Sequence, residues 1–389
     1  MDKVENIGSA YDLTEPSVDT DLTDVVRGTP TGEMLRRYWQ PIELSETVQE
    51  LPLSVRVLGE DLILFRTKSG EPGLVHPRCC HRGTSLLFGR TEKEGIRCCY
   101  HGWLFNPQGV CLEQPCEPNP TEVNTYFRQP WYPVEERYGL VFAYLGPPEQ
   151  KPQLPQYDVL ENLVDGEYLR SNGNSIGAGG PKRMPCNWFQ THENIMDPYH
   201  VLVLHSSFSD IQFTQDMGRA MSVTYHETPT GMYSIQLRKL EDGSTLRRQT
   251  EAVLPNVRIV ADPRLNIMGA SNNVAWTLPV DSTNTRIFTV FKFGNGKIEP
   301  ERLGEAAMYG GKTWFELDDV GHQRFPGDFE AQVGQGAITW HSEEHLAFSD
   351  EGVREFRKLH RAKVREVSES GRVKQQAEIK VTAGNFIDP

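Results

Sequence analysis

The sequence predicts an α+β protein in which a small all-β module precedes a larger α+β domain. Short alternating segments joined by tight turns fill residues 38–145, whereas strand-like and helical segments mix after residue 149. A proline-rich stretch at residues 147–155 forms a stiff connection between the two regions. We therefore expect an N-terminal segment (1–37) that packs on the second domain, a first domain (38–148) and a second domain (149–389).

Composition narrows the classes of function. The chain has 389 residues, of which 38% are hydrophobic and 24% charged, enough for two ordinary soluble domains. Lys and Arg number 40 against 53 Asp and Glu, so the net charge of -13 argues against a nucleic-acid partner and an anionic membrane surface. Because the start lacks a basic and apolar leader pattern and no long apolar run follows, we expect a cytoplasmic protein without a membrane span.

Local patterns predict the individual elements. A short helix is expected at Glu33–Tyr38, after the polar Thr29–Gly32. In the first domain, alternation predicts strands at 54–58, 62–65, 96–98, 103–105, 110–112 and 139–144. In the second domain, we expect helical structure at 184–205, successive strands at 221–293, and one long charged helix or a helix pair at 343–367.

Two short cysteine and histidine motifs predict a metal cluster. Cys79-x-His81 is followed by Cys98-x-x-His101. Two thiolates on one iron and two imidazoles on the other form a Rieske [2Fe-2S] centre, in which the neutral histidines raise the reduction potential. A zinc site could use the same residue types, but Cys-x-His is too short for the usual finger spacing. The pattern therefore favours the iron-sulfur cluster.

The doubled cysteines leave a choice of ligand. Cys80 and Cys99 adjoin the proposed ligands Cys79 and Cys98. Successive side chains of an extended loop point in opposite directions, so Cys80 and His81 would not face one metal together. We expect Cys80 and Cys99 to be buried free thiols.

A second motif predicts a mononuclear metal site. It reads Asn194-x-x-Asp197-x-x-His200-x-x-x-x-His205. Two histidines five residues apart do not align on a regular helix, so a distorted or ending helix is required. With one distant carboxylate they would form the facial triad that leaves open positions on Fe(II) for O₂. We expect the remaining histidines to be packed core residues: His192, His226, His322, His341, His345 and His360.

Both motifs resemble those of one enzyme family. Arg82-Gly83 and Gly102-Trp103 complete loops like those of Rieske-type ring-hydroxylating oxygenases, and the second motif is similar to the mononuclear-iron motif of the same superfamily. The resemblance covers nearly the whole chain and is nearest to the branch of phthalate dioxygenase and vanillate demethylase. It implies an all-β Rieske domain, a catalytic domain with a helix-grip-like antiparallel sheet, and a homotrimer of terminal oxygenase (alpha) subunits.

The resemblance also implies further site residues. The third iron ligand should be a carboxylate toward the C-terminus, for which Asp328 is chosen and Glu330 stays open; Asp318 and Asp319 are expected to be surface charges. Asp197, with Asn194 as a second candidate catalytic residue, would link His200 to His101 of a neighbouring subunit. The alternative for Asp197 is a helix cap.

The implied activity uses O₂ and electrons from NAD(P)H. No G-x-G-x-x-G fingerprint is present, so a separate flavin or iron-sulfur reductase is needed, with or without a ferredoxin. The substrate would be an aromatic acid or aryl ether that is hydroxylated or O-dealkylated. Two alternatives are an electron-transfer Rieske protein without oxygenase activity and a zinc-binding scaffold. Six arginines could bind a carboxylate of the substrate, but we expect each of them to be a surface residue: Arg219, Arg238, Arg247, Arg248, Arg258 and Arg264.

Overall fold

The structure is a computed structural model that describes residues 15–120, 122, 126–174, 180–209, 212–294 and 312–389. The first fourteen residues, and with them the expected lack of a leader, lie outside this range. Within the described part, no helix combines the length and the apolar character needed to cross a membrane.

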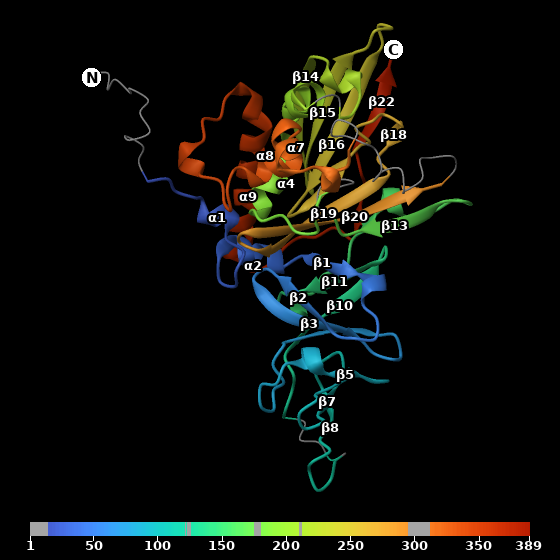
Figure 1. The fold of residues 1–389 in the computed structure, drawn as a ribbon, viewed down its shortest axis with the longest axis vertical. Coiled ribbons are helices and arrows are strands. Elements are labelled where there is room, and N and C mark those ends of the chain that lie inside the picture. Colours follow the sequence, from blue (N-terminus) through green and yellow to red (C-terminus); the bar gives the residue numbers. More distant parts are fainter. Residues whose placement is uncertain (1–14, 121, 123–125, 175–179, 210–211, 295–311) are drawn as a thin grey trace.

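Three small antiparallel sheets build the first part of the chain. The first contains β1 (Trp39–Leu44), β11 (Leu140–Tyr144) and β10 (Val134–Arg137). The second contains β2 (Leu53–Val57), β3 (Glu60–Arg66), β4 (Pro72–Val75) and β9 (Trp131–Tyr132). The third contains β5 (Arg90–Thr91), β6 (Ile96–Arg97), β7 (Leu104–Phe105) and β8 (Cys111–Glu113). This third sheet forms the tip at one end of the elongated molecule (Figure 1).

A nine-stranded sheet dominates the other end. Its main path runs through β13 (Tyr168–Asn172), β20 (Asn284–Phe293), β19 (Asn273–Asp281), β17 (Val257–Val260), β16 (Thr245–Val253), β15 (Gly231–Lys239) and β14 (Met221–Thr228). Off this path lie β18 (Gly269–Ala270) and β22 (Gly384–Asp388), and a separate parallel pair joins β12 (Gln156–Tyr157) to β21 (Glu378–Ile379). The predicted succession of strands over residues 221–293 is confirmed, and with it the α+β class.

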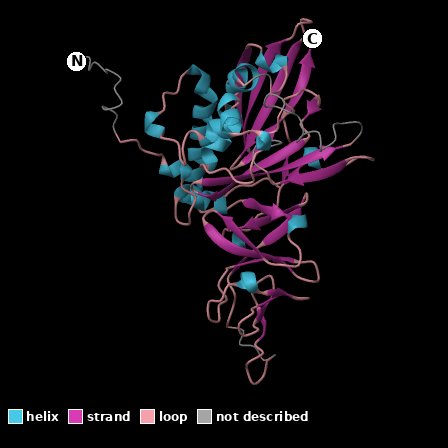
Figure 2. Cartoon of the chain, viewed as in Figure 1, coloured by secondary structure: helices cyan, strands magenta, loops and turns pink. Residues whose placement is uncertain are grey.

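The helices gather on one side of this sheet (Figure 2). They are α1 (Thr20–Thr23), α2 (Pro30–Arg36), α4 (Trp188–Glu193), α5 (His200–Val203), α7 (Asp319–Arg324), α8 (Asp328–Val333) and α9 (Glu351–Ser370). A π-helix, η7 (Leu204–Phe208), directly continues α5. Helices α1 and α2 pack against α9, so the chain before β1 lies against the helical layer.

Helix boundaries differ from the prediction in three regions. Within residues 184–205, helical structure begins only at Trp188 and is divided into α4, a 3-10 turn at Asn194–Met196 and α5. Helix α2 begins at Pro30 rather than Glu33, because the Thr29 side chain accepts the Gly32 N–H at 3.2 Å and proline fits the first helical turn. Helix α9 begins at Glu351, since residues 341–350 form two 3-10 turns and the loop between them. It ends before Gly371, whose φ of +66° is left-handed. Charge pattern alone does not locate such caps.

One hydrophobic core joins the two parts of the chain. At their junction, the turn between β2 and β3 reaches β19: Leu58 N–H donates to the Pro279 carbonyl at 3.0 Å and Gly59 N–H to the Val280 carbonyl at 2.9 Å. A second, smaller core fills the tip and includes the side chains of Cys79 and Cys98. The tip therefore has its own packing around the first cysteine and histidine motif.

A buried ion-pair network holds α9 against α4. Arg357 on α9 donates to both carboxylate oxygens of Glu193 at 2.7 Å and to Glu344 at 2.5 and 2.8 Å. The side chains of Arg357 and Glu193 are only 8% and 9% exposed. Because Glu193 ends the helix that precedes the second motif, this network anchors that region.

We predict that Arg357→Gln lowers the free energy of unfolding by about 3–5 kcal/mol, because Glu193 would stay buried without its partner. Urea denaturation followed by circular dichroism measures the change. Arg365→Gln, at an exposed position of the same helix, is the matched control and should stay near wild type. Equal denaturation midpoints for the two variants would contradict the anchoring role.

Candidate metal centres

The two loops of the first motif have the same backbone design. In each, the first cysteine N–H donates at 2.9 Å to the carbonyl five residues on, which is Thr84 for Cys79 and Trp103 for Cys98. The glycine four residues after each cysteine donates back to its carbonyl, at 2.8 Å and 3.1 Å. These glycines have φ values of +77° and +73°, which explains the residue type.

The side chains of these loops form two facing pairs. The thiols of Cys79 and Cys98 are buried and interact; burial raises the pKa of Cys79, and the neighbouring Cys98 raises it further. The rings of His81 and His101 lie 4.6 Å apart, and His81 stacks on Trp103 at 4.5 Å. His81 is exposed and His101 half-buried, so the histidine side of the tip faces outward.

This arrangement fits a two-iron cluster better than a single zinc ion. Tetrahedral zinc needs all four ligand atoms about 2.0–2.3 Å from one point. Among the described residues, however, three ligating atoms lie within 4.8 Å of one another only in His200, His205 and Asp328. A paired set of thiols and a paired set of imidazoles is what two irons in one cluster require.

Cys80 and Cys99 are exposed, so the prediction that they are buried thiols is wrong. Their exposure follows from the alternating direction of successive side chains in each loop, which also distinguishes them from the proposed ligands Cys79 and Cys98. Cys79 and Cys98 point into the tip core, and the residue after each points away from it.

Gln129 holds the first loop and was missed by sequence reasoning. It is fully buried, and its Oε1 accepts the Cys80 N–H at 2.8 Å. Its Nε2 donates to the carbonyls of His76 and Arg78 at 2.7 and 2.9 Å. A lone glutamine some fifty residues from the loop carries no local signal of this contact.

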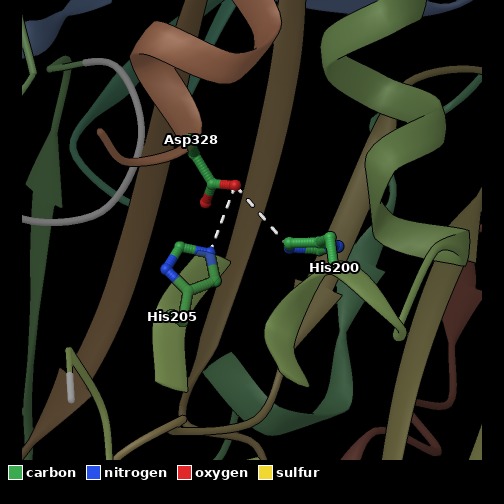
Figure 3. Close-up of side chains that lie close together, drawn as sticks. All are labelled: His200, His205 and Asp328. Atoms are coloured by element: carbon green, nitrogen blue, oxygen red, sulfur yellow. Dashed lines mark ion pairs between the residues drawn. The ribbon is translucent and has the colours of Figure 1, made fainter. Parts of the chain in front are cut away.

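The second motif converges on one carboxylate (Figure 3). His205 Nε2 lies 3.3 Å and His200 Nε2 3.6 Å from Oδ1 of Asp328. That oxygen is buried and makes no hydrogen bond, as expected of an atom that needs a metal. Two imidazole nitrogens and a carboxylate oxygen form the donor set of the facial triad, so the residues present fit a mononuclear iron.

The π-helix explains how histidines five residues apart can face one point. His200 begins α5, and His205 lies in η7, where hydrogen bonding follows the i to i+5 pattern. The expected distortion of the helix is therefore present. Asp328 approaches from the first turn of α8, which belongs to a distant part of the chain.

Each histidine is oriented through its other ring nitrogen. His200 Nδ1 lies within hydrogen-bonding distance of the Asp197 backbone carbonyl, and His205 Nδ1 lies 2.6 Å from Oε1 of Gln212. Both contacts favour a proton on Nδ1 and leave Nε2 as the free ligand atom. Gln212, seven residues after His205, is a second functional residue that sequence reasoning missed.

The charges around Asp328 keep it ionised. Burial alone would raise its pKa, but His205, His200 and Arg258 hold the pKa well below its usual range. Burial lowers the pKa of His200, whereas Asp197 and Asp328 raise it to give a net increase. The pocket thus stabilises a carboxylate opposite two imidazoles.

Glu330 does not join this group. Its Oε1 accepts from Trp314 Nε1 and lies 2.8 Å from His322 Nδ1, while its Oε2 accepts from Gly327 N–H at 2.8 Å. The segment is helical rather than extended, so residues two apart point to different sides. Asp318 and Asp319 are exposed, as expected, and Asp318 caps α7.

Asp197 lies beside His200 with its carboxylate partly open. Oδ1 accepts the N–H groups of Tyr199 and His200 at 3.1 and 3.3 Å, while Oδ2 lies 3.6 Å from His200 Nδ1. Its side chain is 28% exposed. Asn194 Nδ2 is 3.5 Å from His200 Nδ1, so Asn194 adjoins that ring without facing Asp328.

A cavity of about 520 Å³ opens beside His205 and Asp328. Apolar side chains form much of its wall: Phe213, Val260, Ile267, Ala275, Ile287, Phe291 and Phe293. Arg258 and Arg264 also line it, while Arg238 and Arg248 are buried elsewhere in the domain. The expectation that these four arginines lie at the surface is therefore wrong.

The histidines outside the two motifs differ in burial. His192 and His360 are buried as expected, whereas His226 and His345 are exposed.

Comparison with known proteins decides the family. Residues 38–129 match the Rieske [2Fe-2S] domain. The chain is 45% identical to the phenoxybenzoate dioxygenase subunit alpha of Ectopseudomonas oleovorans, over 98% of this chain and 95% of that protein. It belongs to the Rieske non-haem iron oxygenases, as a terminal oxygenase subunit. The expected alternatives, an electron-transfer protein without oxygenase activity and a zinc scaffold, are therefore wrong.

Other similarities place it in the predicted branch of this oxygenase family. The phthalate 4,5-dioxygenase oxygenase subunit of Pseudomonas putida is 29% identical over 89% of this chain and 85% of its own length. Dicamba monooxygenase shares the fold, with a TM-score of 0.62 at 16% identity over 86% of this chain and 98% of that one. The oxygenase carries a [2Fe-2S] cluster and a mononuclear iron.

We predict that Gln129→Leu destabilises the first loop, because it leaves one N–H and two carbonyls without a hydrogen-bond partner. Each of these groups that stays buried should lower the free energy of unfolding by about 1–3 kcal/mol. The melting temperature and the acid-labile sulfide content of the purified oxygenase should both fall. Gln108→Leu, an exposed glutamine in the same region, is the control. Unchanged sulfide and melting temperature in Gln129→Leu would refute the structural role.

Proposed function

We propose that this oxygenase uses O₂ and electrons relayed from NAD(P)H by a separate reductase, with or without a ferredoxin, to hydroxylate or O-dealkylate an aromatic acid or aryl ether. The observation that carries the proposal is the convergence of His200, His205 and Asp328 beside a largely apolar cavity. The similarity to a phenoxybenzoate dioxygenase subunit supports a diaryl ether carboxylate as the first substrate to test.

We assign the metal ligands from the geometry above. Cys79, Cys98, His81 and His101 would hold the cluster, and His200, His205 and Asp328 the mononuclear iron. When bound, the cluster supplies a one-electron relay and the iron supplies the O₂ chemistry. The protein orients the ligands: Gln212 and the Asp197 carbonyl hold protons on the two Nδ1 atoms, and Phe213 packs 4.4 Å from the His205 ring.

The same reasoning supports the division of the chain that we propose: residues 1–37 as a segment on the catalytic domain, 38–148 as the Rieske domain and 149–389 as the catalytic domain. Contacts of α1 and α2 with α9 support the first assignment. A further contact between the described part of this segment, residues 15–37, and helix α9 joins Thr31 Oγ1 to His360 Nε2 at 3.4 Å.

We propose a homotrimer in which electrons pass between subunits. Within one chain, the tip that carries β5–β8 lies far from α4 and the sheet behind it (Figure 1). The outward-facing His101 and the partly open Asp197 are suited to meet across a subunit interface. Asp197 would then link its own His200 to His101 of the neighbour.

Asp328→Ala tests the proposed function most directly. We expect this variant to lose about one of about three irons per chain while it keeps about two sulfides and the cluster spectrum. Oxygenation of the aromatic acid should stop. Glu330→Ala, which removes a nearby carboxylate with other partners, should keep its iron. Iron retained in Asp328→Ala but lost in Glu330→Ala would reverse the assignment.

Asp197→Asn tests the link between subunits. Both metals should stay bound, because neither site loses a proposed ligand, while steady-state turnover should fall about 10- to 100-fold. Metal analysis and product formation with a surrogate reductase provide the two readouts. Asp242→Asn, in an exposed turn, is the control. Normal turnover in Asp197→Asn would exclude the bridging role.

A further inference from the structure

The cavity beside His205 is lined by five cationic side chains, which differ in how their charges are balanced. They are Arg170, Lys182, Arg258, Arg264 and Arg286. Arg286 pairs with both carboxylate oxygens of Glu43 at 3.0 and 3.2 Å. Lys182 is exposed to solvent, and Arg170 has an interaction of its own. Arg286 is thus balanced by Glu43, Lys182 is in contact with solvent, and Arg170 is not a free cation.

Arg258 is different. It lies on β17, half-buried, and within the described residues its side chain makes one long hydrogen bond, from Nη1 to the Thr191 carbonyl at 3.4 Å. Over the described part of the chain, its guanidinium has no carboxylate within 4.0 Å. Burial lowers its pKa, although Asp328 opposes the shift. Since Asp328 faces His200 and His205, most of the five N–H donors of Arg258 remain available.

Arg264 adds a second positive charge to the same cavity. It is half-buried, and burial lowers its pKa. The nearby Asp262 does not pair with it, because the Asp262 carboxylate accepts the backbone N–H groups of Arg264, Asn266 and Ile267 at 3.1, 2.8 and 3.1 Å. That carboxylate therefore fixes the turn after β17; its charge partly offsets the effect of burial on the pKa of Arg264, but it makes no ion pair with the guanidinium.

A guanidinium withdrawn from water without a counter-charge is destabilising. Its planar set of donors matches a carboxylate in two parallel hydrogen bonds, which are among the strongest polar contacts in proteins. The wall of the cavity that Arg258 lines also includes aromatic and branched side chains, such as Phe213, Val260 and Phe291. An apolar pocket with an unbalanced cation suits an aromatic ring that carries one negative group.

We propose that Arg258 binds the carboxylate of an anionic aromatic substrate and makes this oxygenase specific for aromatic acids over neutral aryl ethers. The inference rests on the proposed function, because it concerns the cavity beside the three-residue iron site. Arg258 is the contact residue, and Arg264 contributes a second positive charge to the same cavity.

The wild-type protein provides a test that needs no substitution. Calorimetric titration without O₂ compares phenoxybenzoate with phenoxybenzamide, which has nearly the same shape but no charge. The acid should bind at least about 10-fold more tightly than the amide, as expected for a charge-assisted pair. Equal affinities would overturn the proposal whether or not any variant folds.

Variants then locate the contact. Arg258→Gln should weaken binding of the acid about 10- to 100-fold and change binding of the amide less than about twofold. Arg258→Lys, which keeps the charge but loses the planar donor pair, should fall between Gln and wild type. Arg247→Gln is the matched control, because Arg247 pairs with Asp388 and does not line the cavity.

Three results would contradict the assignment. If Arg264→Gln produced the larger loss, the carboxylate would bind there instead. If Arg258→Gln weakened acid and amide alike, or lost iron, Arg258 would act only on Asp328. If neutral aryl ethers were turned over as fast as aromatic acids, the inference about Arg258 would be rejected and the proposed function would stand. If the acid bound more tightly than the amide but was not turned over, the proposed function would be rejected and the inference about binding would stand.

Discussion

A buried carboxylate that faces two histidine nitrogens is the constraint on which the catalytic half of this oxygenase depends. Oδ1 of Asp328 makes no hydrogen bond, and His200 and His205 present Nε2 to it at 3.6 and 3.3 Å. Such an arrangement is costly unless a cation completes it. The surrounding elements serve this geometry: the π-helix aligns the histidines, and Gln212 and the Asp197 carbonyl orient their rings.

The carboxylates near this site, Glu330 and Glu193, have structural roles instead. Glu330 caps the turn that presents Asp328, and Glu193 is neutralised by Arg357 where α4 leads into the motif. Each of these acids has partners of its own, so of the three only Asp328 faces the Nε2 atoms of the two histidines. Arg258 is a cation of the adjoining cavity: Asp328 influences its pKa, but no carboxylate of the described residues lies within 4.0 Å of its guanidinium.

Both metal motifs could be predicted because a metal dictates residue type and spacing over a short stretch of chain. The third ligand was harder. Asp328 and Glu330 could be separated only once α8 proved helical, since an extended segment would present both on one side. Sequence reasoning gave Cys80 and Cys99 a direction opposite to that of Cys79 and Cys98 but the wrong burial, because burial depends on which side of each loop meets the tip core.

Contacts between distant segments were beyond local patterns. Gln129 reaches back to the loop of Cys79, and Arg258 becomes half-buried only when β17 joins the nine-stranded sheet and Thr191 of α4 lies beside it. An arginine or glutamine in isolation has the surface as its best prediction. The start of α2 is different, because it had a local signal: Thr29 caps the helix and Pro30 is its first residue.

The most direct test of the account is a single-turnover experiment without any reductase. The purified oxygenase is reduced, freed of excess reductant, mixed with phenoxybenzoate and exposed to O₂, while the cluster spectrum and the product are followed together. We predict that the cluster is reoxidised as oxygenated product appears, and that both events require an intact site of His200, His205 and Asp328. Oxygenated product from a chain that lacks this site, or no product from a fully metal-loaded chain that has bound the acid, would contradict the central claim.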